Sequence, residues 1–366
     1  MGWIQKTLRI TSPIARYRLR RILVISIAWM VIDLFLYLRN VTSGSDIDYP
    51  YQEISLTACL LRASIVLISG FLMSWLLLKE LKIVFRNKTL LTGWLIKVFL
   101  LLLMALAVNA LIFFFHFLII KGVNFTETIS QFESFFLHTN IVTNSLLFWL
   151  IVLLSAQIVV EIDQKYSPGV FWEILTGKYL KPRNEKRIIM FLDLKDSTPI
   201  AEQLGHEKYF LFIRDFIYYV SKAVLENNGM IYQYVGDEVV VTWPYNKQNI
   251  LKSVNTVIES RRAIQRKADH FRREYNDIVP EFRVGLHAGE VTIGEIGIIK
   301  KDIAISGEAM NTAARIRSAC NELNQKFIVS KEYFDTGIFK SWQGENLGEV
   351  SLKGMDESIE LYALKI

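Results

Sequence analysis

Two aspartates in the second half of the chain stand where carboxylates can hold a metal ion. Asp193 lies near the end of an apolar segment, 187–194, that predicts a buried strand, and Asp237 lies in a turn between two further predicted strands. Where a first strand runs beside such a hairpin, both carboxylates fall at one end of the sheet. Hard oxygen ligands on rigid strands, with room left for phosphate oxygens, suit Mg²⁺. Together the two residues predict a magnesium site, although either one alone is an ordinary turn residue.

The segment after Asp193 predicts a phosphate-binding loop. Pro199 fits the first turn of a helix, and the leading N–H groups of a helix have no partner within it. These groups would face a phosphate beside the metal. The alternative is that Asp196 or Ser197 simply caps the helix. The residues of the predicted loop are Leu194, Lys195, Asp196, Ser197 and Thr198.

The elements that must position these residues follow one another over residues 186–366. Apolar periodicity predicts strand 187–194, helices 199–204 and 207–227, hairpin 230–234/238–243, helix 248–275, strands 281–288 and 290–294, helix 308–321, and short closing strands. Strand, helix, hairpin, helix, strand is the order of a ferredoxin-like α+β sandwich. In this arrangement Glu238 is expected to point away from the metal candidates, and His287 to bond locally.

The first half of the chain predicts an all-α membrane domain over residues 1–160. Its four apolar stretches are each near or beyond the roughly 20 residues that span a bilayer. They are residues 22–38, 54–78, 94–120 and 135–160. Residues 161–185 then form a predicted linker, with a break at Ser167, Pro168 and Gly169.

The charge of the chain is divided unevenly between the two halves. The net charge of +6 separates into 14 Lys+Arg against 7 Asp+Glu over residues 1–160, and 28 against 29 over residues 161–366. Because the basic residues gather before the first stretch and between the second and third, both termini are expected in the cytoplasm of a multi-pass protein of the cell (inner) membrane. The expected anionic partner of these residues is the lipid bilayer. A second half without basic excess argues against nucleic-acid binding.

Four polar residues within or beside the apolar stretches need partners. Asp33 and Arg62 lie at similar depth in adjacent antiparallel spans, which predicts an ion pair. His116 and His138 also fall at similar depth, where two histidines could bind haem or a metal. Local hydrogen bonding of the two histidines is the expectation preferred over a cofactor.

From about Arg187 to Leu364 the sequence resembles the catalytic domain of class III nucleotidyl cyclases, the adenylyl and guanylyl cyclases. Each of the motifs that carry the resemblance is weak alone, and their order and spacing make the match. The motifs are Phe191-Leu-Asp-Leu-Lys-Asp-Ser-Thr198, Val235-Gly-Asp-Glu238, Gly285-Leu-His-Ala-Gly-Glu-Val-Thr-Ile-Gly294, Ser306-Gly-Glu-Ala-Met-Asn-Thr-Ala-Ala-Arg315 and Leu352-Lys-Gly354.

The resemblance implies a role for each matching residue. Asp193 and Asp237 match the two aspartates that bind two Mg²⁺ (or Mn²⁺) per active site. Asn311 matches the residue that orients the ribose, Arg315 the one that stabilises charge on the α-phosphate, and Lys353 the lysine that holds the triphosphate. In this family the metal pair and the Asn–Arg pair meet across a dimer interface, which implies a homodimer with two equivalent sites. The reaction implied is the cyclisation of a nucleoside triphosphate.

The two positions linked to base choice match neither branch of the family. Gln233 stands where many adenylyl cyclases have lysine, and Ala304 where they have Asp or Thr; the Glu and Cys usual in guanylyl cyclases are also missing. ATP is the expected substrate and GTP the alternative. A catalytically inactive membrane sensor that only binds nucleotide is a further alternative. A diguanylate cyclase is disfavoured because Val235-Gly-Asp-Glu-Val239 lacks the Gly-Gly-Asp-Glu-Phe pattern of that family.

Overall fold

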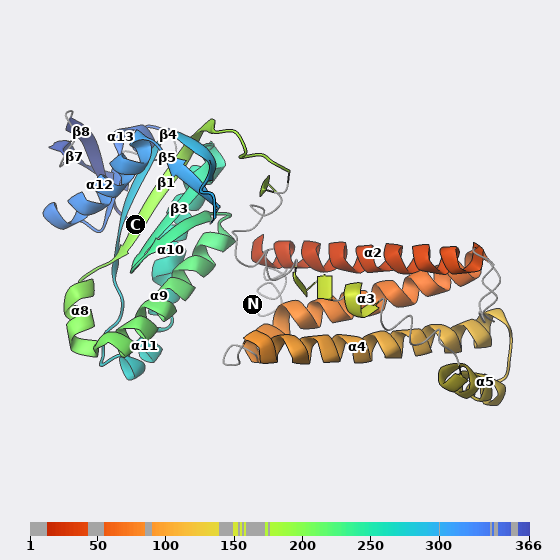
Figure 1. Cartoon of the computed structure of the whole chain (residues 1–366). Helices are drawn as coiled ribbons and strands as arrows, with labels where there is room; N and C mark the ends of the chain where they lie inside the picture. The colour runs from red at the N-terminus through yellow and green to blue at the C-terminus, as the bar shows by residue number, and fades with distance from the viewer. Residues whose placement is uncertain are drawn as a thin grey trace. The chain divides into compact units, whose positions relative to one another are not determined.

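The computed structural model describes two compact units of the chain, separated between Gln164 and Lys165. The described residues are 13–42, 55–84, 90–138, 149–152, 154–155, 157–158, 173–174, 176–299, 301–336, 339, 343–352 and 358–366. The first unit is helical, and the second combines a sheet with helices (Figure 1).

Three long apolar helices lie in the described part of the first unit. They are α2 (Pro13–Thr42), α3 (Leu56–Val84) and α4 (Leu90–Phe115), the last continued by a π-helical turn, η1 (His116–Ile120). Within them the stretches Leu19–Arg39, Leu56–Trp75 and Leu95–Ile120 are long and apolar enough to cross a membrane. The first three predicted stretches are thus confirmed as apolar helices, and they indicate a membrane protein.

The predicted fourth span, 135–160, is not confirmed. The part of the chain that the structure describes holds three candidate spans. Residue 135 lies inside α5 (Phe125–His138), a helix that starts well before the predicted span and carries Glu127 and Glu133 among its apolar residues. This mixed pattern is typical of an amphipathic helix and not of a span. Residues 139–148 and 159–160 of the predicted span lie outside the described residues.

Asp33 and Arg62 form the predicted ion pair inside the first unit. Nε of Arg62 donates to Oδ2 of Asp33 at 2.5 Å and Nη2 donates to Oδ1 at 2.9 Å, a bidentate arrangement. Asp33 is 3% exposed and Arg62 9%. The guanidinium also lies 5.1 Å from the ring centroid of Tyr37. The pair therefore links α2 to α3 where each charge alone would be costly.

Removing one partner of this pair is expected to destabilise the first unit strongly. Arg62→Leu leaves the Asp33 carboxylate buried without its cation, at a cost of about 3–5 kcal/mol in the free energy of unfolding. Adding Asp33→Leu should recover most of that loss. Unfolding of the purified protein by SDS titration measures both effects, with Ser64→Ala, an exposed position on α3, as the control. A double variant as unstable as the single one would contradict the prediction.

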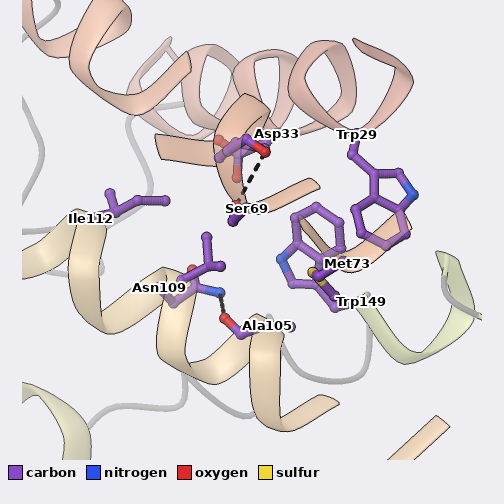
Figure 2. A pocket seen from close by; sticks show the side chains of 10 residues that line it. Trp29, Asp33, Ser69, Met73, Ala105, Asn109, Ile112 and Trp149 are labelled. Carbon is purple, nitrogen blue, oxygen red and sulfur yellow. Dashed lines mark hydrogen bonds between the residues drawn. The ribbon is translucent and has the colours of Figure 1, made fainter. Parts of the chain in front are cut away.

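A hollow of about 370 Å³, part of it open, lies beside the buried ion pair (Figure 2). Two tryptophans, Trp29 and Trp149, contribute to its wall, and Asp33 reaches it from α2. Ser69 Oγ donates to the carbonyl oxygen of Ile65 on its own helix, and Asn109 Nδ2 donates to that of Ala105. The polar side chains at the wall thus already bond within the bundle. Of the two predicted facing histidines, His116 is buried, whereas the side chain of His138 lies outside the described residues.

The second unit is built on one eight-stranded sheet in the order β2-β3-β1-β4-β6-β8-β7, with β5 paired to β4. Strands β1, β2, β3 and β4 pair antiparallel in the order β2-β3-β1-β4, and β6 runs parallel to β4. This is the expected ferredoxin-like arrangement, extended by a C-terminal part. The strands are β1 (Arg183–Leu194), β2 (Met230–Val235), β3 (Glu238–Pro244), β4 (Phe282–Ile296), β5 (Asp302–Ser306), β6 (Phe327–Ser330), β7 (Gly344–Ser351) and β8 (Ser358–Leu364).

Helices cover both faces of this sheet (Figure 1). Alternate residues of β1 point to opposite faces, so that Ile188, Met190 and Leu192 pack with α9 and α10, whereas Ile189 and Phe191 pack with α12. Both faces are apolar because both are covered. The helices are α8 (Ser197–Leu204), α9 (His206–Glu226), α10 (Lys247–Gln265), α11 (Ala268–Glu274), α12 (Glu308–Glu322) and α13 (Lys331–Phe334).

Three predicted boundaries are wrong in this unit. The predicted helix 248–275 is two helices, α10 and α11, that break at Arg266 and Lys267. The predicted strands 281–288 and 290–294 are one strand, β4, because Gly289 continues the ladder opposite Arg187. Strand β1 starts at Arg183, inside the predicted linker 161–185.

Glycines of β4 let α12 lie directly on the sheet. A Cβ at Gly285 would come 2.4 Å from the backbone nitrogen of Arg317 and 2.8 Å from the carbonyl oxygen of Ala313. At Gly289 it would come 2.7 Å from Cβ of Ala309. Contacts this short are not tolerated, so only glycine fits at these two positions. The close packing fixes the distance between α12 and the carboxylates of β1 and β3.

Candidate active site

Three carboxylates gather where β1 ends and β3 begins. The register pairs Leu192 with Val239, so one further step sets Asp193 opposite Glu238, the first residue of β3. Asp237 precedes it in the turn, where Gly236 takes a positive φ of 63°. The structure therefore brings together the two predicted metal ligands. It also shows that the expected orientation of Glu238, away from this cluster, is wrong.

Arg317 of α12 binds this cluster and was not found from the sequence. Its Nη1 lies 3.3 Å from Oδ2 of Asp193, and its Nη2 lies 2.7 Å from Oε2 of Glu238. The three side chains are between 12% and 25% exposed. Continuing the β1–β3 register would have located Glu238, but the position of Arg317 depends on the packing of α12 on Gly285.

Burial and neighbouring carboxylates make the carboxyl group of Asp193 less acidic. Burial raises the pKa of its carboxyl to about 6; the nearby Arg317 guanidinium opposes this shift, and the carboxylates of Asp237 and Glu238 add to it. Oδ2 of Asp237 is buried without a hydrogen-bond partner in the described structure. A cluster of this kind binds protons or cations more readily than an isolated carboxylate does.

The pKa of Asp193 predicts how the stability of the metal-free protein depends on pH. Because the folded-state pKa, about 6, lies above the ordinary 3.8, the folded state binds this proton more tightly, and stability falls as pH rises from about 4 to 6. Asp193→Asn removes this dependence. In EDTA, the variant should be more stable than the wild type by about 3 kcal/mol at pH 7.5 and nearly equally stable near pH 4. Thermal melting of the second unit at both pH values measures this. Equal stability at pH 7.5 would contradict it.

The predicted phosphate loop forms a turn between β1 and α8. Leu194 is buried, and the backbone N–H of Lys195 donates to the carbonyl oxygen of Glu281 at 2.8 Å. Asp196 has a φ of 57° and precedes Ser197 as the N-cap of α8, without a side-chain capping bond. The alternative role of Asp196 as a capping side chain is therefore not seen. Thr198, in the first turn of α8, is exposed.

Tyr209 is a second residue near the cluster that sequence reasoning missed. Burial raises the pKa of its hydroxyl, and the Asp237 carboxylate adds to this shift. His287 on β4 bonds locally as expected, with Nδ1 2.8 Å from Oγ of Ser330.

Asn311 and Arg315 lie on α12 but not at the cluster of their own chain. They are four residues apart, about 40° around the helix, whereas Arg315 and Arg317 are separated by about 200°. Since Arg317 faces the carboxylates of β1 and β3, Arg315 projects from the other side of the helix. Asn311 is exposed, and Arg315 is half-buried without an ion pair in the described residues. One chain therefore does not bring the two predicted sets together.

The two base-choice positions adjoin a contact between β2 and β5. The backbone N–H of Ile305 donates to Oη of Tyr232 at 3.2 Å, so the β4–β5 hairpin reaches β2. Gln233 follows Tyr232 and is exposed, and Ala304 precedes Ile305 and is half-buried. Lys353, the predicted triphosphate ligand, lies outside the described residues.

Comparison with known proteins finds sequences similar to the second unit. The model of the adenylate and guanylate cyclase catalytic domain matches residues 180–366. Adenylate cyclase 2 of Rhizobium meliloti (strain 1021) is 30% identical over 210 residues, which are 56% of this chain and 57% of that protein. An adenylate cyclase of Anabaena cylindrica is 26% identical over 55% of this chain and 42% of its own length. A receptor-type guanylate cyclase of Caenorhabditis elegans is 22% identical over 54% of this chain and 18% of its own.

A solved structure supports the fold of the second unit. A bacterial light-regulated adenylyl cyclase superposes with a TM-score of 0.52 at 18% identity, over 60% of this chain and 64% of that one. The chain thus spans less than two thirds of each of these relatives.

Proposed function

Because the chain belongs to the adenylate and guanylate cyclase catalytic-domain family, we propose that it is a membrane-bound adenylate cyclase that converts ATP to 3′,5′-cyclic AMP and pyrophosphate. One observation carries the proposal. Asp193, Asp237 and Glu238 crowd together at the end of β1, directly before the loop that leads into α8. Anionic oxygens beside a helix start are suited to a metal-bound phosphate.

The residues of this cluster fit a divalent cation. Their donors are hard carboxylate oxygens, one of which, Oδ2 of Asp237, is buried without a hydrogen bond. Among the described residues, no group of three or more His, Cys, Asp or Glu side chains is arranged to hold a metal ion, so water and substrate oxygens would have to supply the remaining ligands. Asp193 and Asp237 would hold two Mg²⁺ (or Mn²⁺), whose charge would lower the pKa of the ribose 3′-hydroxyl and neutralise the departing phosphates.

The other residues position the nucleotide for an in-line attack of the 3′-oxygen on the α-phosphorus. Asn311 would orient the ribose through its amide, and Arg315 would stabilise the charge that develops on the α-phosphate. Backbone N–H groups of the loop at 194–198 would bind phosphate oxygens, and Lys353 the end of the triphosphate. Positioning and charge neutralisation supply most of the rate in phosphoryl transfer.

The active unit that we propose is a homodimer. Arg315 projects away from the carboxylates of its own chain, which supports a site completed by a second copy. A two-fold axis would then create two equivalent sites, each with the aspartates of one chain and the Asn311–Arg315 pair of the other.

The choice between adenine and guanine depends on the residues near Gln233. Gln233 is exposed beside the β2–β5 contact, and its amide can both donate to and accept from a purine edge. GTP is therefore the second candidate substrate. The test is to incubate the purified full-length protein with ATP or GTP in Mg²⁺ or Mn²⁺ and to separate the products. Cyclic AMP from ATP is expected; cyclic GMP alone would move the assignment to guanylate cyclase, and neither product would favour an inactive sensor.

The first unit would hold the enzyme in the cell (inner) membrane with both termini in the cytoplasm. The apolar helices α2, α3 and α4 support the membrane location, and the basic residues at their predicted cytoplasmic ends support the orientation. Whether this unit senses a ligand or only anchors the enzyme is tested by comparing the cyclase rate of the full-length protein with that of residues 165–366, the second unit.

A further inference from the structure

Arg317 is the charged residue at the candidate site to which the proposed reaction gives no role. It comes from α12, whereas the carboxylates it contacts belong to β1 and β3. Its Nη1 is 3.3 Å from Asp193, a proposed metal ligand, and its Nη2 is 2.7 Å from Glu238. The guanidinium of Arg317 therefore lies beside Oδ2 of Asp193, an oxygen that a bound metal ion would also need.

The packing of α12 holds Arg317 in this position. Its backbone nitrogen rests on Gly285 of β4, closer than any side chain there would allow. The neighbours Ala313, Ile316 and Cys320 on the same helix are fully buried. With its side chain only 25% exposed, Arg317 is therefore not a residue of a solvated helix face.

The contacts of this guanidinium are incomplete. Nε of Arg317 is buried without a hydrogen-bond partner in the described structure, as are Oδ2 of Asp237 and, apart from the ion pair, Oε2 of Glu238. One guanidinium also pairs with two carboxylates, those of Asp193 and Glu238, in a cluster of three. A cation that leaves buried donors and acceptors unsatisfied is more easily displaced than one held by a full set of hydrogen bonds.

We propose that Arg317 is a built-in counter-ion of the metal site, which competes with divalent cations for Asp193 and thereby sets the metal affinity of the site. This inference rests on the proposed function only in taking Asp193 as a metal ligand. Arg317 is a positioning residue: it holds the carboxylates in place before the metal binds, and it must give up Asp193 when the metal arrives. A metal ion of charge +2 competes with the guanidinium because both are attracted to the same oxygens.

The test is the affinity of the full-length protein for Mn²⁺ without nucleotide, measured from the electron paramagnetic resonance signal of free Mn²⁺. Arg317→Gln removes the charge at similar size and should tighten Mn²⁺ binding by about tenfold or more. Arg317→Lys keeps the charge and should stay close to the wild-type affinity. Arg262→Gln removes an exposed arginine of α10 and controls for net charge. Asp193→Asn combined with Arg317→Gln should lose the tight binding.

A second variant guards against misfolding of Arg317→Gln, which leaves Glu238 buried without its cation. Arg317→Gln with Glu238→Gln removes both partners together and should still bind Mn²⁺ several-fold more tightly than the wild type. Unchanged or weaker binding by the variants that lack Arg317 would overturn the inference while leaving the metal site intact. If Mn²⁺ binding by the wild type does not depend on Asp193, the metal assignment of the proposed function fails instead.

Discussion

Replacing Asp193 by alanine is expected to lower cyclic nucleotide formation by about a thousandfold or more. The carboxylate lies at the centre of the cluster, opposite Glu238, within 3.3 Å of Arg317 and close enough to Asp237 for the carboxylate of Asp237 to raise its pKa. The measurement is the initial rate of product formation from ATP at saturating Mg²⁺, repeated with Mn²⁺.

The control for this variant removes a carboxylate elsewhere in the same unit. Asp269 on α11 is exposed, and among the described residues its carboxylate pairs with Arg272 on its own helix, so Asp269→Ala should keep the wild-type rate. The melting temperature of the second unit must not fall in either variant. If Asp193→Ala keeps more than a tenth of the rate, the metal-binding role assigned to Asp193 is wrong.

The order of elements in the second unit was predictable because local patterns decide it. The alternation of apolar residues marks strands such as Met230–Val235, and turn residues such as Gly236 mark the hairpin. The misplaced boundaries have no local signal. Helix α10 ends at Gln265 without a glycine or proline nearby, and Gly289 suggests a break where the strand in fact continues. Such positions depend on contacts between distant segments.

The candidate site was predictable as two separate groups of residues. Spacing located Asp193 and Asp237, and the four-residue separation placed Asn311 and Arg315 on one helix face. What the sequence could not supply is the direction in which α12 faces the sheet. Arg317 turns toward the carboxylates because the helix is seated on Gly285, and Arg315 then faces away. Arg317 therefore contacts the carboxylates of its own chain, whereas Arg315 is expected to reach those of a second chain.

Replacing Arg315 by alanine is expected to lower the cyclisation rate by about a hundredfold or more, because the charge on the α-phosphate would lose the guanidinium that we propose stabilises it. The substitution should leave stability nearly unchanged, since Arg315 has no ion pair among the residues that the structure describes. Binding of a non-hydrolysable ATP analogue should be weakened much less than the rate. The measurement is the ratio of kcat between variant and wild type.

Mixing two inactive variants distinguishes a site shared between chains from a site within one chain. If Asp193→Ala and Arg315→Ala are produced together in equal amounts, half of the dimers combine one chain of each kind, and each of these has one intact site. About a quarter of the wild-type rate should then return. The control is a protein in which every chain carries both substitutions, and it should stay inactive. Because Arg315 projects away from the carboxylates of its own chain, we expect recovery; a mixture as inactive as its components would mean that the two sets do not meet across a dimer interface.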